Sequence, residues 1–375
     1  MVRRKILSLL PLLCLLIHAT PARSQVSSAR IDAVFRGLKS NKSPGAAALV
    51  VYNGRTVFRR GYGVTDLRTL QLIDERTNFR LASFTKQFTA ACIMLLVHDG
   101  KLHYDDHLTD IFPEFPAYGK SITVRNLLNH TSGLKDYEKL MLKQYPDTPP
   151  EKVPQIHDAG VLKLLEQQTS AKFPAGTKWE YSNSGYAVLA MIVERVSGKL
   201  FGQFLQERIF TPLNMKNTLA YEKGKNKVPH RAYGHTGKDK DWHETDQSPT
   251  SAVLGDGGIY SSIDDLAKWD RALLLHTLLT DAEMQPALTP VQPADGPAGF
   301  PEGKPVSYGF GWFLDPYHGH KRMSHDGETI GFRTTIQRFP DDQLTIIVLA
   351  NRTDGDPEAL ALKIADLYLV KEHAH

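Results

Sequence analysis

Apolar residues follow a strand pattern near both ends of the chain and a helical pattern between them. Near the start, apolar runs at residues 46–52 and 56–60 flank Asn53-Gly54, a dipeptide favoured in tight hairpin turns. Near the end, four more segments are predicted as strands, at residues 306–314, 322–325, 332–339 and 344–350. The pattern therefore predicts strands at both ends of the chain.

The middle of the chain has apolar residues at helical spacing. Helices are predicted over residues 31–38, 83–98, 122–129, 161–168, 185–196, 201–209, 264–275 and 360–370. Residues 223–246 are charged and rich in turn formers, which predicts a surface loop. This order predicts an α+β fold, in which an antiparallel sheet built from both chain ends is flanked by helices and a mainly helical lobe is inserted. The sheet lobe would span about residues 25–82 and 300–375, and the helical lobe about 83–299.

The first 24 residues have the features of a secretion signal. Residues 3–5 are basic, residues 6–19 form an apolar core, and Ala22 and Ser24 place small side chains at the two positions that a signal peptidase recognises. The apolar stretch is short for a membrane span and contains Pro11. We therefore predict a secreted or periplasmic protein with no stable membrane anchor after cleavage.

The formal charge of +4 comes from the predicted signal. That segment holds four basic residues and no acidic one, so the mature chain would be neutral. A neutral balance gives no reason to expect nucleic acid or an anionic membrane surface as a partner. The mature chain retains one cysteine, Cys92, which cannot form an intramolecular disulfide.

Several enzyme classes lack their signatures in this sequence. There is no G-x-S-x-G of an α/β-hydrolase, no H-E-x-x-H, no cysteine–histidine spacing for zinc and no glycine-rich phosphate loop. We therefore predict that the protein uses no metal and no cofactor.

Two stretches match S-x-x-K, which places a serine and a lysine one helical turn apart. Ser83 and Lys86 lie at the start of a predicted apolar helix, directly after an extended segment. Both side chains would share one face of the helix, and the helix N-terminus would favour negative charge beside the serine. Ser132 and Lys135 follow a helix that has ended and flank Gly133, which favours a turn. Ser83 is therefore the candidate nucleophile.

Two further patterns carry candidate chemistry. Tyr181-Ser182-Asn183 is the only Y-x-N in the chain and lies on a predicted loop, where functional side chains are often displayed. On its own this motif is better explained as a core tyrosine beside a capping asparagine. Of three H-x-G stretches, only His325-Asp326-Gly327 ends a predicted strand beside another strand, where a rigid edge could line a pocket.

Taken in order, Ser83-x-x-Lys86, Tyr181-x-Asn183 and His325-x-Gly327 resemble the three motifs of the class C β-lactamase and D-alanyl-D-alanine carboxypeptidase superfamily, the penicillin-recognising serine hydrolases. Other stretches similar to this family occur at residues 99–102, 105–106, 127–134, 255–258 and 308–312. The resemblance covers nearly the whole mature chain and implies a β-lactamase/transpeptidase-like fold.

The resemblance implies a role for each matched residue. Ser83 would attack a carbonyl carbon and form an acyl-enzyme. Lys86 would ease the deprotonation of Ser83, as a neutral amine or as a positive charge that stabilises a tyrosinate. Tyr181 would move the proton as base and then as acid. Asn183 would donate to a substrate amide or hold Lys86.

The third motif would contribute a strand edge. The oxyanion would be stabilised by the backbone N–H groups of Ser83 and Glu328, the residue after Gly327. His325 stands where the best-known members often have lysine, and a histidine need not be charged at pH 7, so anchoring of a substrate carboxylate becomes less secure. Asp326 and Glu328 would also disfavour anionic substrates unless their side chains point away.

The expected function is that of a secreted serine hydrolase acting on amide or ester bonds of a small-molecule or peptide substrate. Peptidoglycan-like D-amino-acid peptides, β-lactams and small esters are the candidate substrates, with efficient β-lactamase activity the least expected. The alternative is a catalytically silent penicillin-fold module that binds cell-wall peptides or a protein partner. Because all three reactive residues are present, we expect catalysis.

Overall fold

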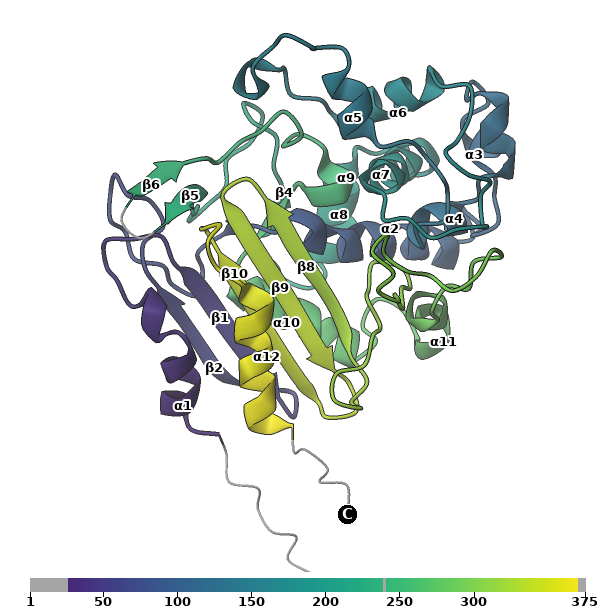
Figure 1. Ribbon diagram of the computed structural model, residues 1–375. Helices are drawn as coiled ribbons and strands as arrows, with labels where there is room; N and C mark the ends of the chain where they lie inside the picture. The colour runs from purple at the N-terminus through teal and green to yellow at the C-terminus, as the bar shows by residue number, and fades with distance from the viewer. Residues whose placement is uncertain (1–25, 239–240, 370–375) are drawn as a thin grey trace, which may run out of the picture.

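The computed structural model describes residues 26–238 and 241–369, so the predicted signal at residues 1–24 lies outside the described residues. A five-stranded antiparallel sheet in the order β2-β1-β10-β9-β8 forms one side of the molecule (Figure 1). Its strands are β1 (Ala46–Tyr52), β2 (Arg55–Tyr62), β8 (Met323–Thr329), β9 (Phe332–Phe339) and β10 (Leu344–Ala350). β1 pairs with β10 along its whole length. The prediction of an antiparallel sheet built from both chain ends is confirmed.

Both faces of the sheet are covered, which explains the continuous apolar run in β1. Ala46 and Ala48 pack in a core with two terminal helices, whereas Ala47 and Leu49 face a second and larger core. A strand that is covered on both sides must be apolar on both sides. The terminal helices lie in front of the sheet and a third helix lies behind it (Figure 1). These helices are α1 (Ser28–Val34), α12 (Pro357–Tyr368) and, behind the sheet, α10 (Ile263–Leu274).

The larger core is built around α2 (Lys86–His98), whose residues are buried from Lys86 to Leu96. As predicted, α2 ends at His98, and Gly100 follows in the left-handed conformation with a φ of +67°. The other helices of this part are α3 (Leu108–Ile111), α4 (Val124–Leu128), α5 (Tyr137–Leu142), α6 (Asp158–Glu166), α7 (Asn183–Ser197), α8 (Phe201–Leu205), α9 (Leu254–Gly257) and α11 (Asp281–Met284). A small sheet pairs β7 (Ile259–Ser261) with β3 (Phe79–Arg80) and β4 (Leu219–Ala220).

The predicted strand at residues 306–314 is wrong. In this segment Tyr308 and Phe313 form an isolated bridge, and Phe313 also bridges to Ser324 on β8. Gly311 has a φ of +75°, and a Cβ at this position would lie 2.9 Å from the backbone oxygen of Lys86. The backbone turns at Gly311 and packs closely against the start of α2, so the segment does not stay extended.

The predicted end of the strand at His325 is also wrong. β8 continues to Thr329, and the hairpin turn falls at Ile330-Gly331, where Gly331 has a φ of +74°. The His325-x-Gly327 motif therefore lies inside an edge strand and not at its end.

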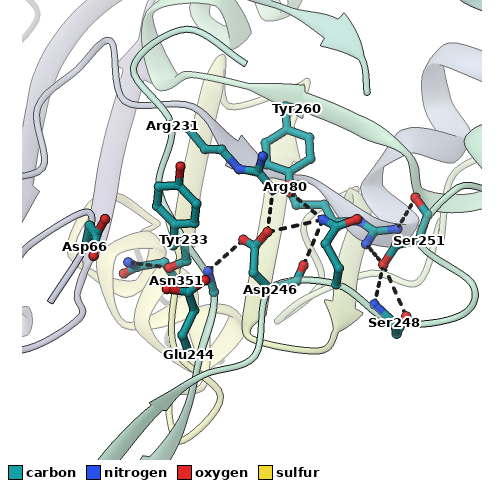
Figure 2. Close-up of polar contacts among 12 residues, drawn as sticks. Asp66, Arg80, Arg231, Tyr233, Glu244, Asp246, Ser248, Ser251, Tyr260 and Asn351 are labelled. Atoms are coloured by element: carbon teal, nitrogen blue, oxygen red, sulfur yellow. Dashed lines mark hydrogen bonds and ion pairs between the residues drawn. The ribbon is translucent and has the colours of Figure 1, made fainter. Parts of the chain in front are cut away.

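The predicted surface loop at residues 223–246 contains a short hairpin of β5 (His235–Lys238) and β6 (Asp241–Glu244). A partly buried ion pair between Arg231 and Asp246 joins the residues that flank this hairpin (Figure 2). Asp246 also accepts a hydrogen bond from the backbone of Gly234 at 3.0 Å. The Arg231 guanidinium lies over three tyrosine rings, at 4.5 Å from Tyr221, 5.0 Å from Tyr233 and 5.2 Å from Tyr260. The charge pair closes the segment on itself, and the rings of Tyr221 and Tyr260, which lie outside the segment, hold Arg231 against the rest of the protein.

Within the described ranges, the helices are all too short or too polar to cross a membrane.

Candidate active site

Ser83 lies where β3 gives way to α2, in a 3₁₀ turn over Ala82–Thr85. Ala82, directly before it, has a φ of +51°, a conformation that L-residues with a side chain rarely adopt. Such strain persists only where surrounding contacts hold it, and it is common at functional sites. The helix that follows points its N-terminus toward Ser83, which supports the prediction that Ser83 opens a helix.

Lys86 is fully buried one turn after Ser83. Its Nζ donates hydrogen bonds to Ser83 Oγ at 3.1 Å, to Asn183 Oδ1 at 2.9 Å and to the backbone oxygen of Asp256 at 3.0 Å. Burial lowers the pKa of this amine to about 8, against the opposing pull of the acidic groups of Asp256 and Glu138. Roughly one part in ten of such an amine is neutral at pH 7, so it can accept a proton from Ser83.

Tyr181 faces the same lysine from the segment before α7. Lys86 Nζ lies 4.9 Å from the centre of the tyrosine ring, and the ring stacks on Phe313 at 6.5 Å between centroids. Burial raises the pKa of the Tyr181 phenol well above its ordinary value, although a hydrogen bond with Ser83 acts in the opposite direction. The phenol therefore keeps its proton at neutral pH. It is better suited to relay a proton than to act as a preformed tyrosinate base.

Asn183 is the first residue of α7, whose N-cap Ser182 accepts a hydrogen bond from Gly185 N at 3.1 Å. The Oδ1 atom of Asn183 accepts a hydrogen bond from Lys86, and its Nδ2 atom donates one to Glu138 Oε1 at 3.3 Å. Of the two roles expected for Asn183, this geometry supports holding the lysine.

His325 occupies a buried position on the edge strand β8. Its Nδ1 lies 2.7 Å from the backbone oxygen of Asp326, which can only accept, so Nδ1 carries the proton. Its Nε2 is then the acceptor for the hydroxyl of Tyr308 at 3.2 Å. Burial, with the charge of Lys86, lowers the pKa of His325 to about 3. The ring is neutral and both nitrogens are engaged within the protein.

Gly327 lets β8 approach the turn that carries Ser83. A Cβ at this position would lie 2.0 Å from the backbone oxygen of Leu81 and 2.2 Å from Thr334 Oγ1. The same Leu81 oxygen accepts a hydrogen bond from Thr334 Oγ1 at 2.8 Å, so strand and turn are joined. A side chain at Gly327 would push the edge strand away from Ser83.

Glu328 presents its backbone and not its carboxylate to this edge. Ser324 exchanges backbone hydrogen bonds with Phe313 outside the sheet. Because outward-facing groups recur every second residue on an edge strand, the backbone N–H of Glu328 also points outward. The Glu328 side chain is exposed and forms an ion pair with Arg333 at 2.6 Å. Its negative charge is thereby partly compensated at the surface of the protein.

Three residues of the site had no predicted role. His130 is fully buried, accepts a hydrogen bond from Ser182 N at 3.1 Å, and lies 4.4 Å from Tyr181 between ring centroids. Asp256 accepts from the hydroxyl of Tyr137 at 2.9 Å, and burial raises the pKa of its carboxyl to about 6. Glu138, at the start of α5, contacts Asn183. His130 and Asp256 lie in stretches that resemble the family, whereas Glu138 has no sequence signal.

The second S-x-x-K is a turn, as predicted. Ser132 Oγ accepts a hydrogen bond from Leu134 N at 3.3 Å, and Gly133 has a φ of +68°. Lys135 Nζ instead contacts Gln168 Oε1 at 3.2 Å. Across the residues that the structure describes, no group of three His, Cys, Asp or Glu side chains is arranged to hold a metal ion.

The sheet, the helical part and the serine placed between them define a class of protein, the serine hydrolases with a β-lactamase/transpeptidase-like fold. Comparison with known proteins leads to the same class. The family model described as Beta-lactamase matches residues 31–371. The chain belongs to this family, and we describe it as a serine hydrolase.

Its relatives include peptidases and penicillin-binding proteins. Penicillin-binding protein 4* of Bacillus subtilis (strain 168) is 31% identical over 353 residues, which cover 90% of this chain and 74% of that protein. A D-aminopeptidase of Brucella anthropi is 28% identical over 355 residues, which cover 92% of this chain and 63% of that enzyme. This chain thus spans less than two thirds of the D-aminopeptidase.

Two solved structures share the fold. The octameric penicillin-binding protein homologue from Pyrococcus abyssi has a TM-score of 0.76 at 23% identity and covers 91% of this chain and 77% of that one. D-amino acid amidase from Ochrobactrum anthropi SV3, complexed with L-phenylalanine amide, has a TM-score of 0.75 at 24% identity and covers 90% and 96% respectively.

Proposed function

We propose that this protein hydrolyses D-amino-acid amides or short D-amino-acid peptides that carry a free amino group, through an acyl-enzyme on Ser83. The observation that carries the proposal is the 3.1 Å contact between Ser83 Oγ and the buried Lys86 amine, whose pKa is lowered to about 8. A serine beside an amine of this kind is an activated nucleophile.

In acylation, Ser83 Oγ would bond to the substrate carbonyl carbon while its proton moves to the neutral Lys86 amine. The carbonyl oxygen would become an oxyanion held by the backbone N–H groups of Ser83 and Glu328, each such donor being worth about 3 kcal/mol of barrier. Tyr181 would give its proton to the leaving amine and regain one from Lys86. The C–N bond then breaks and leaves an ester on Ser83.

In deacylation the same groups would act in reverse. A water molecule would lose a proton to the Tyr181–Lys86 pair and attack the ester carbon. Ser83 would leave with a proton returned by that pair, which restores the starting state.

Glu138 supports a substrate with a free ammonium group. Its half-buried carboxylate accepts a hydrogen bond from Nδ2 of Asn183. The Oδ1 atom of the same amide accepts a hydrogen bond from Lys86. Burial raises the pKa of Glu138, because the partly buried position disfavours the charged carboxylate relative to the neutral acid. A substrate ammonium beside it would favour the charged form and form a charge-assisted hydrogen bond.

The uncharged state of His325 also favours an amide substrate over a β-lactam. The neutral ring has both nitrogens engaged, so it supplies no positive charge for the carboxylate of a β-lactam or of a C-terminal D-alanine. An amide without a free carboxylate needs no such partner.

Three chromogenic substrates test the proposal: D-alanine p-nitroanilide, its N-acetyl derivative and L-alanine p-nitroanilide. We expect turnover of the first and little of the other two. Glu138→Gln should lower kcat/KM for D-alanine p-nitroanilide about tenfold or more, since the pairing charge is lost, and should lower kcat/KM for the N-acetyl derivative much less. Glu180→Gln, at an exposed glutamate paired with Lys172, is the matched control. Equal turnover of free and acetylated substrates would contradict the role of Glu138.

A fluorophosphonate probe tests the nucleophile separately. We expect labelling of the wild type and of Ser132→Ala, the serine of the second S-x-x-K, and none of Ser83→Ala. A wild type that stays unlabelled would favour the silent binding module. We also propose secretion or export to the periplasm, which sequencing of the N-terminus of the exported protein would test.

A further inference from the structure

Lys86 can accept the proton of Ser83 only when the lone pair of its neutral amine faces that hydroxyl. A neutral amine has two N–H groups and one lone pair. Besides Ser83 Oγ, the neighbours of Nζ are Asn183 Oδ1 and the backbone oxygen of Asp256. Both of these oxygens can only accept. They therefore take the two N–H groups of the neutral amine and leave its lone pair directed at Ser83.

The backbone oxygen of Asp256 belongs to α9, a helix of four residues. The first N–H groups of a helix have no partner within it, and Val253, the residue before α9, has no polar side chain to cap them. Asp158 on α6 supplies both acceptors. Its Oδ2 accepts a hydrogen bond from Leu254 N at 2.8 Å, and its Oδ1 accepts one from Gly255 N at 3.0 Å. Because the Asp158 side chain is buried, water cannot easily take its place.

Gly255, the residue directly before Asp256, is also held at its carbonyl group. Thr89, a fully buried residue of α2, donates a hydrogen bond from Oγ1 to the Gly255 oxygen at 2.7 Å. A Cβ at Gly255 would lie 2.3 Å from the backbone oxygen of Tyr186, so α9 also packs directly on α7. Because the peptide group is planar, a fixed Gly255 carbonyl also fixes the nitrogen of Asp256. The place of the Asp256 oxygen is thus set by side chains of two other helices.

We propose that Asp158 and Thr89 are positioning residues for the reaction. They hold α9 in place, and its Asp256 carbonyl in turn keeps the lone pair of Lys86 directed at Ser83. This inference rests on the proposed role of Lys86 as the base. Both residues act through the backbone of α9 and not on the substrate.

The test measures the rate constant for labelling of Ser83 by a fluorophosphonate between about pH 6 and pH 10. A change that alters only the charge of Lys86 shifts the midpoint of this profile, because the amine is neutral at high pH in either case. A change in the direction of the lone pair lowers the plateau at high pH instead. We expect Asp158→Asn, in which one carbonyl oxygen replaces two carboxylate oxygens, to lower the plateau about tenfold or more. Thr89→Val, which has the same shape, should lower it about threefold.

Asp265→Asn is the matched control. Asp265 is another buried carboxylate, and it accepts hydrogen bonds from Asn217 N at 2.8 Å and Thr218 Oγ1 at 2.9 Å, neither of which belongs to the catalytic site. This variant should keep the wild-type plateau. Circular dichroism shows whether each variant is folded, and Thr89→Val decides alone if Asp158→Asn does not fold. A plateau that stays unchanged in the folded variants, or one that falls as much in Asp265→Asn, would overturn the proposal.

The outcomes also separate this inference from the proposed function. A wild type that is labelled but does not hydrolyse D-alanine p-nitroanilide would refute the proposed substrate, and a lower plateau in Asp158→Asn would still support the positioning role. Turnover of D-alanine p-nitroanilide with an unchanged plateau in both variants would refute the positioning role alone.

Discussion

Replacing Lys86 by methionine would separate the stability of the fold from its chemistry. Lys86 is fully buried, and burial lowers the pKa of its amine from 10.5 to about 8. Between these two values the unfolded chain binds more protons than the folded chain, so the free energy of unfolding rises as the pH rises. Below about pH 8 both states hold the proton, and the folded state carries the full cost of the buried charge.

The size of the effect follows from the two pKa values. A fall from 10.5 to about 8 corresponds to a cost of roughly 3 kcal/mol at low pH. About 2.5 kcal/mol of this cost is recovered between roughly pH 7 and pH 10. Methionine has a similar length and does not titrate. The wild type should therefore gain about 2.5 kcal/mol over Lys86→Met across this interval.

Urea unfolding followed by circular dichroism, at both pH values and for both proteins, measures this gain. Ser83→Ala is the matched control, because it disturbs the same site and keeps the lysine; it should gain stability with pH as the wild type does. We also expect Lys86→Met to lack hydrolytic activity at either pH. If the difference between wild type and Lys86→Met stays the same within about 0.5 kcal/mol, the account of the buried amine is wrong.

Four further outcomes are expected. Gly327→Ala should lower kcat/KM about a hundredfold in steady-state assays, because a Cβ 2.0 Å from the Leu81 oxygen displaces β8 from Ser83; wild-type rates would contradict this. Tyr181→Phe should lower kcat by about 10²–10⁴ if the phenol passes the proton on, and an unchanged kcat would exclude that role. The wild-type pH profile of kcat/KM should rise through about 8 as Lys86 loses its proton, whereas a flat profile would assign the base elsewhere. Arg231→Met should lower the free energy of unfolding by about 3 kcal/mol, since Asp246 loses its partner; a loss below about 0.5 kcal/mol would make the pair dispensable.

Local features of the fold were readable from the sequence because short-range contacts fix them. Asn53-Gly54 takes a left-handed conformation at both residues, with φ values of +51° and +69°, and sets the register of the first hairpin. Ser83 lies in the turn that leads into α2 and Lys86 opens that helix, so their contact needs no other part of the chain. Successive residues of β1 face opposite cores because side chains alternate between the two faces of a strand.

Other predictions failed where distant segments decide the backbone. Residues 306–314 have a strand-like sequence, but packing of Gly311 against the start of α2 turns them. The predicted end of β8 came too early because the turn depends on pairing with β9 and not on the polar run after His325.

The sequence by itself determined the class of chemistry, since the serine, the lysine and the tyrosine with their spacings are local patterns, and it determined that both chain ends would share a sheet. Only the tertiary structure decided how the groups are tuned. Glu138 meets Asn183 and Asp256 meets Lys86 because segments far apart in the chain are packed together. Burial, which shifts the pKa of Lys86 and neutralises His325, is a property of that packing and has no counterpart in a single stretch of sequence.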